Sequence, residues 1–284
     1  PKTPVPPVTN TFFMLWLNGE FLETASLNAA SAGNLLGAGV FTTLGVREGA
    51  PLFLENHLRR LRRDATICGL EISFSNRELG AATRELIARN GVQNGAARIT
   101  VSRRGDGFWC EDAGINALIL AKSRAPLPVF GLKALLFWGV APDLAGVKTT
   151  SYWPYSRAFD AAKEHGYDEA IFLGHDGNLA ECARSTLFFV RENTLCTPAL
   201  AGGALRGVGR EIALEWARKN GILAREGQFS IQDLLDAQET FALTGASGPR
   251  ELIELRETSG SKAPLAGAGE IFGSLRALWS ESLS

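Results

Sequence analysis

Lys148 stands in the stretch AGVKTTSYW (145–153), with no charged residue within four positions on either side. Its neighbours are small, hydroxylated or aromatic. One interpretation is a lysine at a strand end, whose ammonium group reaches water. The other is an amine in a desolvated pocket, where its pKa falls and the neutral amine can attack a carbonyl group. The stretch alone leaves both interpretations open.

Glu181 is the second residue that could do chemistry, because it begins a predicted strand directly after a turn, in GNLAECARSTLFFV (177–190). Small residues follow it, and then an apolar run. A carboxylate in this position can bind the protonated ring nitrogen of a ligand. It can equally be an exposed glutamate at a strand end.

Two stretches of small residues could bind an anion. GALRGVGRE (203–211) precedes a predicted helix, and LTGASG (243–248) follows a predicted strand. Backbone N–H groups at a helix N-terminus favour anions, although glycines in such loops also serve turn geometry alone. The first stretch lacks the lysine and hydroxyl residue of a nucleotide-binding P-loop and the acidic partner of a dinucleotide site. A phosphate on a small cofactor fits it better.

The basic segment HLRRLRR (57–63) is predicted to be helical, so its four arginines cannot share one face. Most of them form a solvated face. Arg60 lies one turn after His57 and can turn inward as a phosphate partner. The net charge of −1 does not favour a nucleic-acid partner.

Hydrolase and metal chemistry have little support. The chain has three histidines, and it contains neither GxSxG before a helix nor HExxH. Its four cysteines show no CxxC spacing and are interpreted as reduced thiols, so no metal site is predicted.

Length and composition predict a globular protein of 284 residues, with 45% hydrophobic and 21% charged residues. No apolar run approaches the roughly 18 residues of a membrane helix, and a cytoplasmic location is inferred. We predict a flexible Pro-rich arm (1–13), an N-terminal domain (14–123), a linker (124–131) and a C-terminal domain (132–284). Strands and helices mix without a strict βαβ rhythm, which predicts an α+β fold with largely antiparallel sheets.

The pattern of apolar and turn residues predicts several strands and helices. The first half has a hairpin at 14–21, strands at 39–54, 96–104 and 116–123, and helices at 55–70 and 75–91. The second half has helices near 154–165, at 208–221 and at 230–237, and a strand within 239–247.

As a set, several segments resemble the class-IV aminotransferase family, which are pyridoxal-phosphate (PLP) enzymes of fold type IV. The resemblance spans about Leu15 to Leu255, and its segments are LNGEF, GVFTTLGV, NHLRRL, AGVKTTSY, GYDEAIFLGHDGNLAECARSTLFFV, CTPAL and GALRGVGRE. It implies a smaller N-terminal α/β domain and a larger C-terminal domain with barrel-like antiparallel sheets.

The resemblance implies a role for each matching residue. Lys148 forms the Schiff base with PLP, Glu181 pairs with the pyridine nitrogen, and Arg60 binds the phosphate. Five more positions are implied near the cofactor, four in the phosphate-side loops and one, after a one-residue gap, at the ring oxygen: Val208, Gly209, Ala246, Ser247 and Tyr152. PLP is the electron sink, and the protein supplies position and electrostatics.

The substrate pocket departs from the subgroups of the family. SRRGDGFWCED (102–112) replaces their carboxylate-binding motifs, and the candidates for a different pocket are Phe41, Arg103, Arg104 and Trp109. The leading prediction is a transaminase using a small amino acid or amine and a keto-acid acceptor. The alternatives are an aminodeoxychorismate lyase releasing pyruvate and 4-aminobenzoate, and a non-catalytic binding protein. In this family the 102–112 loop reaches the neighbouring subunit, which implies a homodimer with the active site near the interface.

Overall fold

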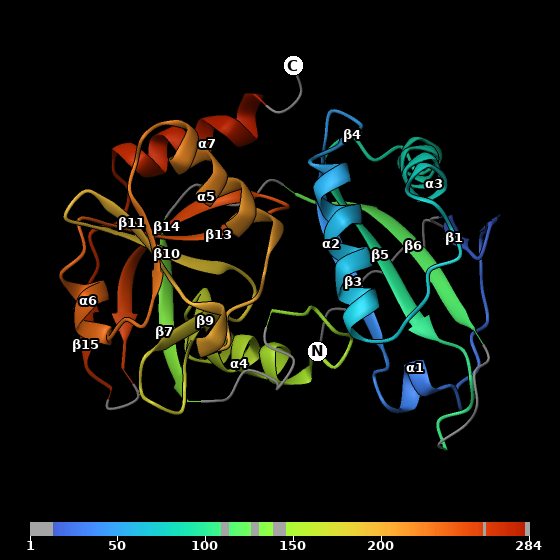
Figure 1. The fold of residues 1–284 in the computed structure, drawn as a ribbon, viewed down its shortest axis with the longest axis horizontal. Helices are drawn as coiled ribbons and strands as arrows, with labels where there is room; N and C mark the ends of the chain where they lie inside the picture. Colours follow the sequence, from blue (N-terminus) through green and yellow to red (C-terminus); the bar gives the residue numbers. More distant parts are fainter. Residues whose placement is uncertain (1–13, 109–113, 126–130, 139–145, 258–259, 282–284) are drawn as a thin grey trace, which may run out of the picture.

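The computed structural model describes residues 14–108, 114–125, 131–138, 146–257 and 260–281. It contains two β-sheets side by side, each covered by helices (Figure 1). The predicted arm (1–13) and most of the predicted linker lie outside the described residues. The assignment of the two sheets to two separate domains stays a prediction.

The first sheet has six strands, all antiparallel, in the order β2-β1-β6-β5-β3-β4. Its strands are β1 (Leu15–Leu17), β2 (Glu20–Leu22), β3 (Gly39–Arg47), β4 (Ala50–Pro51), β5 (Gly95–Arg103) and β6 (Ile115–Ser123). The turn between β1 and β2 uses Asn18 and Gly19 at φ of 52° and 106°, as the predicted Asn-Gly hairpin requires.

Three helices belong to this half: α1 (Ala32–Leu35), α2 (Leu54–Ile67) and α3 (Asn76–Arg89). Ser75 and Glu78 form a reciprocal capping box that fixes the start of α3. Alternate β3 and β5 residues such as Leu44 and Ile99 pack with Leu58 and other apolar side chains of α2 and α3. The intervening residues of β3 and β5 point to the opposite face of the sheet.

The second sheet has nine strands, in the order β12-β11-β10-β13-β14-β7-β8-β9, with β15 paired to β14. Its strands are β7 (Leu132–Trp138), β8 (Glu169–Leu173), β9 (Leu179–Cys182), β10 (Thr186–Arg191), β11 (Thr194–Pro198), β12 (Ala224–Gly227), β13 (Glu239–Thr244), β14 (Gly248–Arg256) and β15 (Lys262–Pro264). Most pairs are antiparallel, whereas β7 is parallel to β8 and β14, and β11 is parallel to β12. Because β9 also contacts β10 and β11, the sheet curls toward a barrel.

Around this sheet lie α4 (Trp153–Glu164), the short η1 (Leu200–Gly202), α5 (Val208–Lys219), α6 (Ile231–Leu235) and α7 (Glu270–Glu281). Helix α5 and helix α7 cover Phe188 and Phe241, which are fully buried. The α+β architecture with largely antiparallel sheets is therefore confirmed. No described helix has the length and apolar character needed to cross a membrane. Cys68, Cys182 and Cys196 are free thiols, and Cys110 lies outside the described residues.

Residues 147–150 connect the two halves, because they run antiparallel to the start of β3 and form an isolated bridge with it, between Thr149 and Val40. The Phe41 N–H donates to the Lys148 carbonyl at 3.1 Å, and the Thr150 N–H donates to the Gly39 carbonyl at 2.8 Å. The Lys148 N–H in turn donates to Asp64 of α2 at 3.1 Å. The backbone of Lys148, which belongs to the second half by sequence, is thus fixed by the first half.

Candidate active site

A cavity of about 900 Å³ is lined by residues of both halves, a volume in the usual range of small-ligand sites. It brings together the eight positions that the sequence associates with a cofactor: Arg60, Lys148, Tyr152, Glu181, Val208, Gly209, Ala246 and Ser247. These positions come from α2, the segment 148–152, β9, α5 and the turn after β13. Their clustering is a property of the tertiary structure, because the chain separates them widely.

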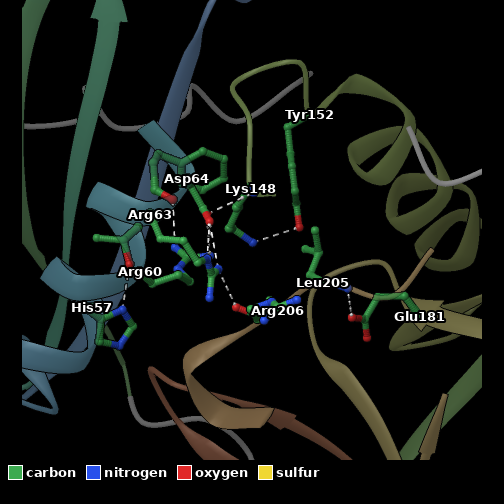
Figure 2. A network of polar contacts seen from close by, with 11 residues as sticks. His57, Arg60, Arg63, Asp64, Lys148, Tyr152, Glu181, Leu205 and Arg206 are labelled. Atoms are coloured by element: carbon green, nitrogen blue, oxygen red, sulfur yellow. Dashed lines mark hydrogen bonds and ion pairs between the residues drawn. The ribbon is translucent and has the colours of Figure 1, made fainter. Parts of the chain in front are cut away.

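Lys148 is half-buried, and its amine points to the Tyr152 hydroxyl at 3.2 Å (Figure 2). The amine also lies 5.0 Å from the centre of the Phe41 ring and 4.6 Å from that of Tyr152. Burial, followed by the positive charge of Arg60, lowers the pKa of Lys148 to about 7, although Glu181 opposes the shift. A large fraction of this amine is therefore neutral near pH 7, as a nucleophile toward a carbonyl must be.

Tyr152 holds a fixed position beside Lys148. Its hydroxyl donates to the Ala183 carbonyl at 2.8 Å, and its ring stacks on Tyr155 with centres 4.7 Å apart. Burial raises the pKa of Tyr152 above its ordinary value, so the phenol stays protonated. It can act as a neutral hydrogen-bonding group next to the amine.

Glu181 is 2% exposed and lies on the other side of the cavity from α2 (Figure 2). Its two carboxylate oxygens accept from the N–H groups of Leu205 at 2.8 Å and Cys182 at 3.1 Å. Burial raises the pKa of Glu181 to about 7, although the Leu205 N–H and the positive charge of Arg210 oppose this shift. A cationic ring nitrogen bound beside this carboxylate would favour its ionised form.

Arg60 is 5% exposed on α2, one turn after His57. Its Nη2 donates to the Phe41 carbonyl at 2.8 Å, and its Nη1 lies 3.8 Å from the Asp64 carboxylate. Its Nε has no hydrogen-bond partner among the described residues. Burial lowers the pKa of Arg60 to about 10, so the guanidinium remains a cation at neutral pH. Such a buried cation with an unused N–H is suited to an anionic ligand group.

The N-terminus of α5 lies beside the turn 244–247. The first N–H groups of any helix have no intrahelical partner, and the N-cap residue Gly207 provides no side-chain hydrogen bond to them. A Cβ atom on Gly209 would collide with Leu243, which shows how closely the helix approaches the strand end. The Ser247 N–H donates to Thr244 Oγ1 at 3.0 Å inside the turn, and the role of Ser247 at the phosphate stays a prediction. The availability of this N–H to a ligand is reduced.

The predicted substrate residues divide into two groups. Phe41 lines the cavity, whereas Arg103 and Arg104 do not, and Arg104 lines a smaller cavity with Asn18 and Asn116. Trp109 lies outside the described residues. The roles of these four side chains stay predictions.

Arg98 lines the cavity and is not among the site residues predicted from the sequence. Its guanidinium lies 3.7 Å from the centre of the Phe41 ring, and its Nε donates to Thr100 Oγ1 at 3.2 Å. Burial lowers the pKa of Arg98 without a described carboxylate partner in hydrogen-bond contact. The alternation of buried Ala97, Ile99 and Val101 along β5 could have indicated it, because alternation places Arg98 on the opposite face.

Glu169 is a second buried carboxylate on the cavity wall. It accepts from Ser185 Oγ at 2.7 Å and from the Ala170 N–H at 3.0 Å, and burial raises its pKa to about 6. Among the described residues no group of three or more His, Cys, Asp or Glu side chains could hold a metal ion. The cavity thus offers an amine, a buried carboxylate and an anion-binding side, which fits an aldehyde cofactor with a ring nitrogen and a phosphate.

Comparisons of this chain with known proteins point to one protein family. The family model described as "Amino-transferase class IV" matches residues 39–250. A probable branched-chain-amino-acid aminotransferase of Rickettsia bellii (strain RML369-C) is 28% identical over 250 residues, covering 82% of this chain and 84% of that protein. An aminodeoxychorismate lyase of Bacillus subtilis (strain 168) is 29% identical over 242 residues, covering 80% and 82%. The crystal structure of a branched-chain aminotransferase from Thermoproteus uzoniensis with norvaline superposes with a TM-score of 0.85 at 26% identity, covering 94% of this chain and 93% of that one.

Proposed function

Since this chain belongs to the class IV aminotransferase family, whose enzymes depend on PLP, we propose that it moves the amino group of a small amino acid or amine to a keto acid, with PLP bound through Lys148. The main support for this proposal is the environment of Lys148. This residue is half-buried, the pKa of its amine is lowered to about 7, and the amine lies 3.2 Å from the Tyr152 hydroxyl. When bound, PLP supplies an electron sink for the bond changes at the substrate carbon.

The protein side chains supply position and proton transfer. Arg60, the α5 N-terminus and the Ala246 side of the turn bind the phosphate. Glu181 holds a protonated ring nitrogen, and Tyr152 hydrogen-bonds next to Lys148. The Lys148 amine accepts and returns a proton at the substrate carbon, which its lowered pKa supports near neutral pH.

Arg98 is the proposed partner of the substrate carboxylate. It lies 3.7 Å from the centre of the Phe41 ring, and the Lys148 amine lies 5.0 Å from the same centre, so both groups are near one ring of the cavity wall. A guanidinium can bind a carboxylate through two parallel hydrogen bonds. This assignment replaces Arg103 and Arg104 as the leading proposal, because neither lines the cavity.

The second candidate function is an aminodeoxychorismate lyase, which the similarity to the Bacillus subtilis protein favours. A panel of L-, D- and aromatic amino acids and simple amines, each with and without a keto acid, tests the proposal. We expect keto-acid product only when an amino acceptor is present. Pyruvate and an aromatic amine formed from aminodeoxychorismate alone would identify the lyase instead. A protein that neither takes up PLP nor turns over any donor would contradict both.

Replacing Arg98 with glutamine should raise KM for amino acids by about 10-fold to 100-fold, because a charge-assisted hydrogen bond of roughly 1.5–3 kcal/mol is lost. Simple amines without a carboxylate should be nearly unaffected, since they do not use the guanidinium. Steady-state kinetics with one matched pair of donors, with and without the carboxylate, gives the measurement. Equal losses for both donors would show that Arg98 has a general structural role.

We also propose that the protein is a homodimer and is located in the cytoplasm. The dimer is supported by an exposed apolar surface near α1, where Leu36, Phe108 and Trp153 are 54%, 73% and 72% exposed. Glycine contacts link these segments, because a Cβ on Gly107 would meet Leu35 and one on Gly37 would meet Ser151. Analytical ultracentrifugation that gives the mass of a single chain at micromolar concentration would contradict the dimer, and fractionation of cells would test the location.

A further inference from the structure

His57 lies on the cavity wall one helical turn before Arg60 and is 3% exposed. Residues three positions apart share a face of a helix, so both side chains point from α2 toward the same part of the site. His57 is not among the site residues predicted from the sequence. Its two ring nitrogens have different surroundings.

The Nδ1 atom of His57 is 2.6 Å from Thr42 Oγ1, and the Thr42 side chain on β3 is fully buried. Burial and the positive charges of Arg60 and Lys148 lower the pKa of His57 to about 3, so the ring is neutral at working pH. A neutral imidazole has one donor and one acceptor nitrogen. If Nδ1 donated to Thr42, the Thr42 hydroxyl proton would have no described acceptor. If Thr42 instead donates to Nδ1, its hydroxyl proton has an acceptor, and the ring proton of His57 then lies on Nε2.

The Nε2 atom of His57 has no hydrogen-bond partner among the described residues. It faces Gly245, where an added Cβ atom would come within 3.1 Å of Nε2. The Gly245 backbone lies near enough to His57 to oppose the lowering of its pKa, although Nε2 makes no hydrogen bond to it by distance and angle. Trp279 Nε1 donates to the Gly245 carbonyl at 3.2 Å.

A second unpartnered donor lies beside the first. Arg60 Nε is also buried without a described partner, although the other nitrogens of its guanidinium are engaged. Buried N–H groups in proteins are almost always satisfied, so two orphans one turn apart indicate an acceptor that the chain itself does not provide. Both line the same cavity as the α5 N-terminus and the turn 244–247.

We propose that His57 is a neutral hydrogen-bond donor of the phosphate-binding side, with Thr42 fixing the ring proton on Nε2 so that Nε2–H binds a phosphate oxygen. The inference rests on the proposed function only in taking this phosphate to be that of PLP. A neutral donor is suited to this position, since Arg60, Arg98 and Arg184 already lower the pKa of Lys148 through their charge. It adds a hydrogen bond to the phosphate without a further positive charge near the amine.

Nitrogen-15 NMR of histidine-labelled protein gives the direct test, because the chain has three histidines and single His→Gln variants assign each signal. For the protein free of PLP we expect a neutral His57 ring with the proton on Nε2. Addition of PLP should shift the Nε2–H signal downfield and slow its exchange, whereas pyridoxal, which lacks the phosphate, should not. A proton on Nδ1, or the same shifted Nε2–H signal with pyridoxal or without any ligand, would overturn the inference.

Two variants test the same atom by affinity. His57→Gln places an amide nitrogen near the position of Nε2, whereas His57→Asn reaches only the Nδ1 side near Thr42. Relative to the wild type, His57→Asn should weaken PLP binding by about 10-fold to 100-fold, the loss of one hydrogen bond to a charged group. Pyridoxal binding should change little, and His57→Gln should restore most of the PLP affinity. His175→Gln, on an exposed histidine, is the matched control.

The measurements distinguish a failure of the proposed function from a failure of the role proposed for His57. If the wild type binds PLP no better than pyridoxal, the phosphate site and with it the proposed function are wrong. If the wild type prefers PLP and His57→Asn keeps that preference, only the role of His57 is wrong. Equal weakening of PLP and pyridoxal by His57→Asn would show a general packing role and would also contradict the inference. Circular dichroism of each variant checks that it is folded.

Discussion

Replacing Lys148 with alanine should abolish the covalent attachment of PLP and lower kcat by about 10²–10⁴-fold, the usual contribution of a positioned acid–base group. The amine is the only described lysine nitrogen that contacts Tyr152, and its lowered pKa makes it neutral near pH 7. Alanine leaves the Lys148 backbone pairing with β3 possible, so the fold should persist. Borohydride reduction followed by intact-protein mass spectrometry measures attachment, and single-turnover kinetics measures the chemical step.

Lys163 provides a matched control for this experiment. It also lines the cavity, but it is exposed and its ammonium lies 3.2 Å from the Asp168 carboxylate. Lys163→Ala should therefore keep both the mass increase on reduction and nearly the full kcat. A Lys148→Ala protein that still gains the mass of reduced PLP, or that turns over at the wild-type rate, would contradict the assignment.

Replacing Glu181 with glutamine should lower kcat by about 10²–10³-fold, comparable with the removal of one preorganised electrostatic partner of a transition state. Glutamine keeps the size of the side chain, but it carries no charge to hold a protonated ring nitrogen. Affinity for PLP should fall less than kcat, because the phosphate contacts remain. Steady-state kinetics, together with PLP titration monitored by visible absorbance, separates the two effects.

Glu169→Gln is the corresponding control, since Glu169 is also buried in the cavity wall and also has a raised pKa. Its carboxylate is engaged with Ser185 and the Ala170 N–H, so it is not assigned to the cofactor. We expect a small loss of kcat for this variant. Equal losses in the two glutamine variants would indicate that any buried charge in this wall supports activity, and would remove the specific role of Glu181.

The sequence predicted much of the local structure because its signals were local. The Asn18-Gly19 hairpin, the capping box at Ser75 and the helix beginning at Val208 each depend on residues within one turn of each other. The cofactor positions came from the family resemblance rather than from any local pattern. Read alone, Lys148 was consistent with a surface residue.

Other features could not be predicted because they depend on contacts between distant segments. The pairing of residues 147–150 with β3 joins positions more than 100 apart in the chain, and no local sequence pattern predicts this pairing. Helix α1 has four residues, too short for a hydrophobic period to appear. Arg98 and His57 lie on predicted elements, but only the tertiary structure shows that their faces border the cavity.

The pairing of the Lys148 segment with β3 also joins folding to ligand binding. Because Asp64 and Phe41 hold the backbone that carries the amine, the site exists only while the two sheets are docked. A cofactor that touches both sides binds the docked form alone, and its binding free energy is then added to the stability of docking. The contact between residues 147–150 and the first half should accordingly open first when the cofactor is removed. A substitution at this contact would weaken cofactor binding, even where no ligand-contacting residue has changed.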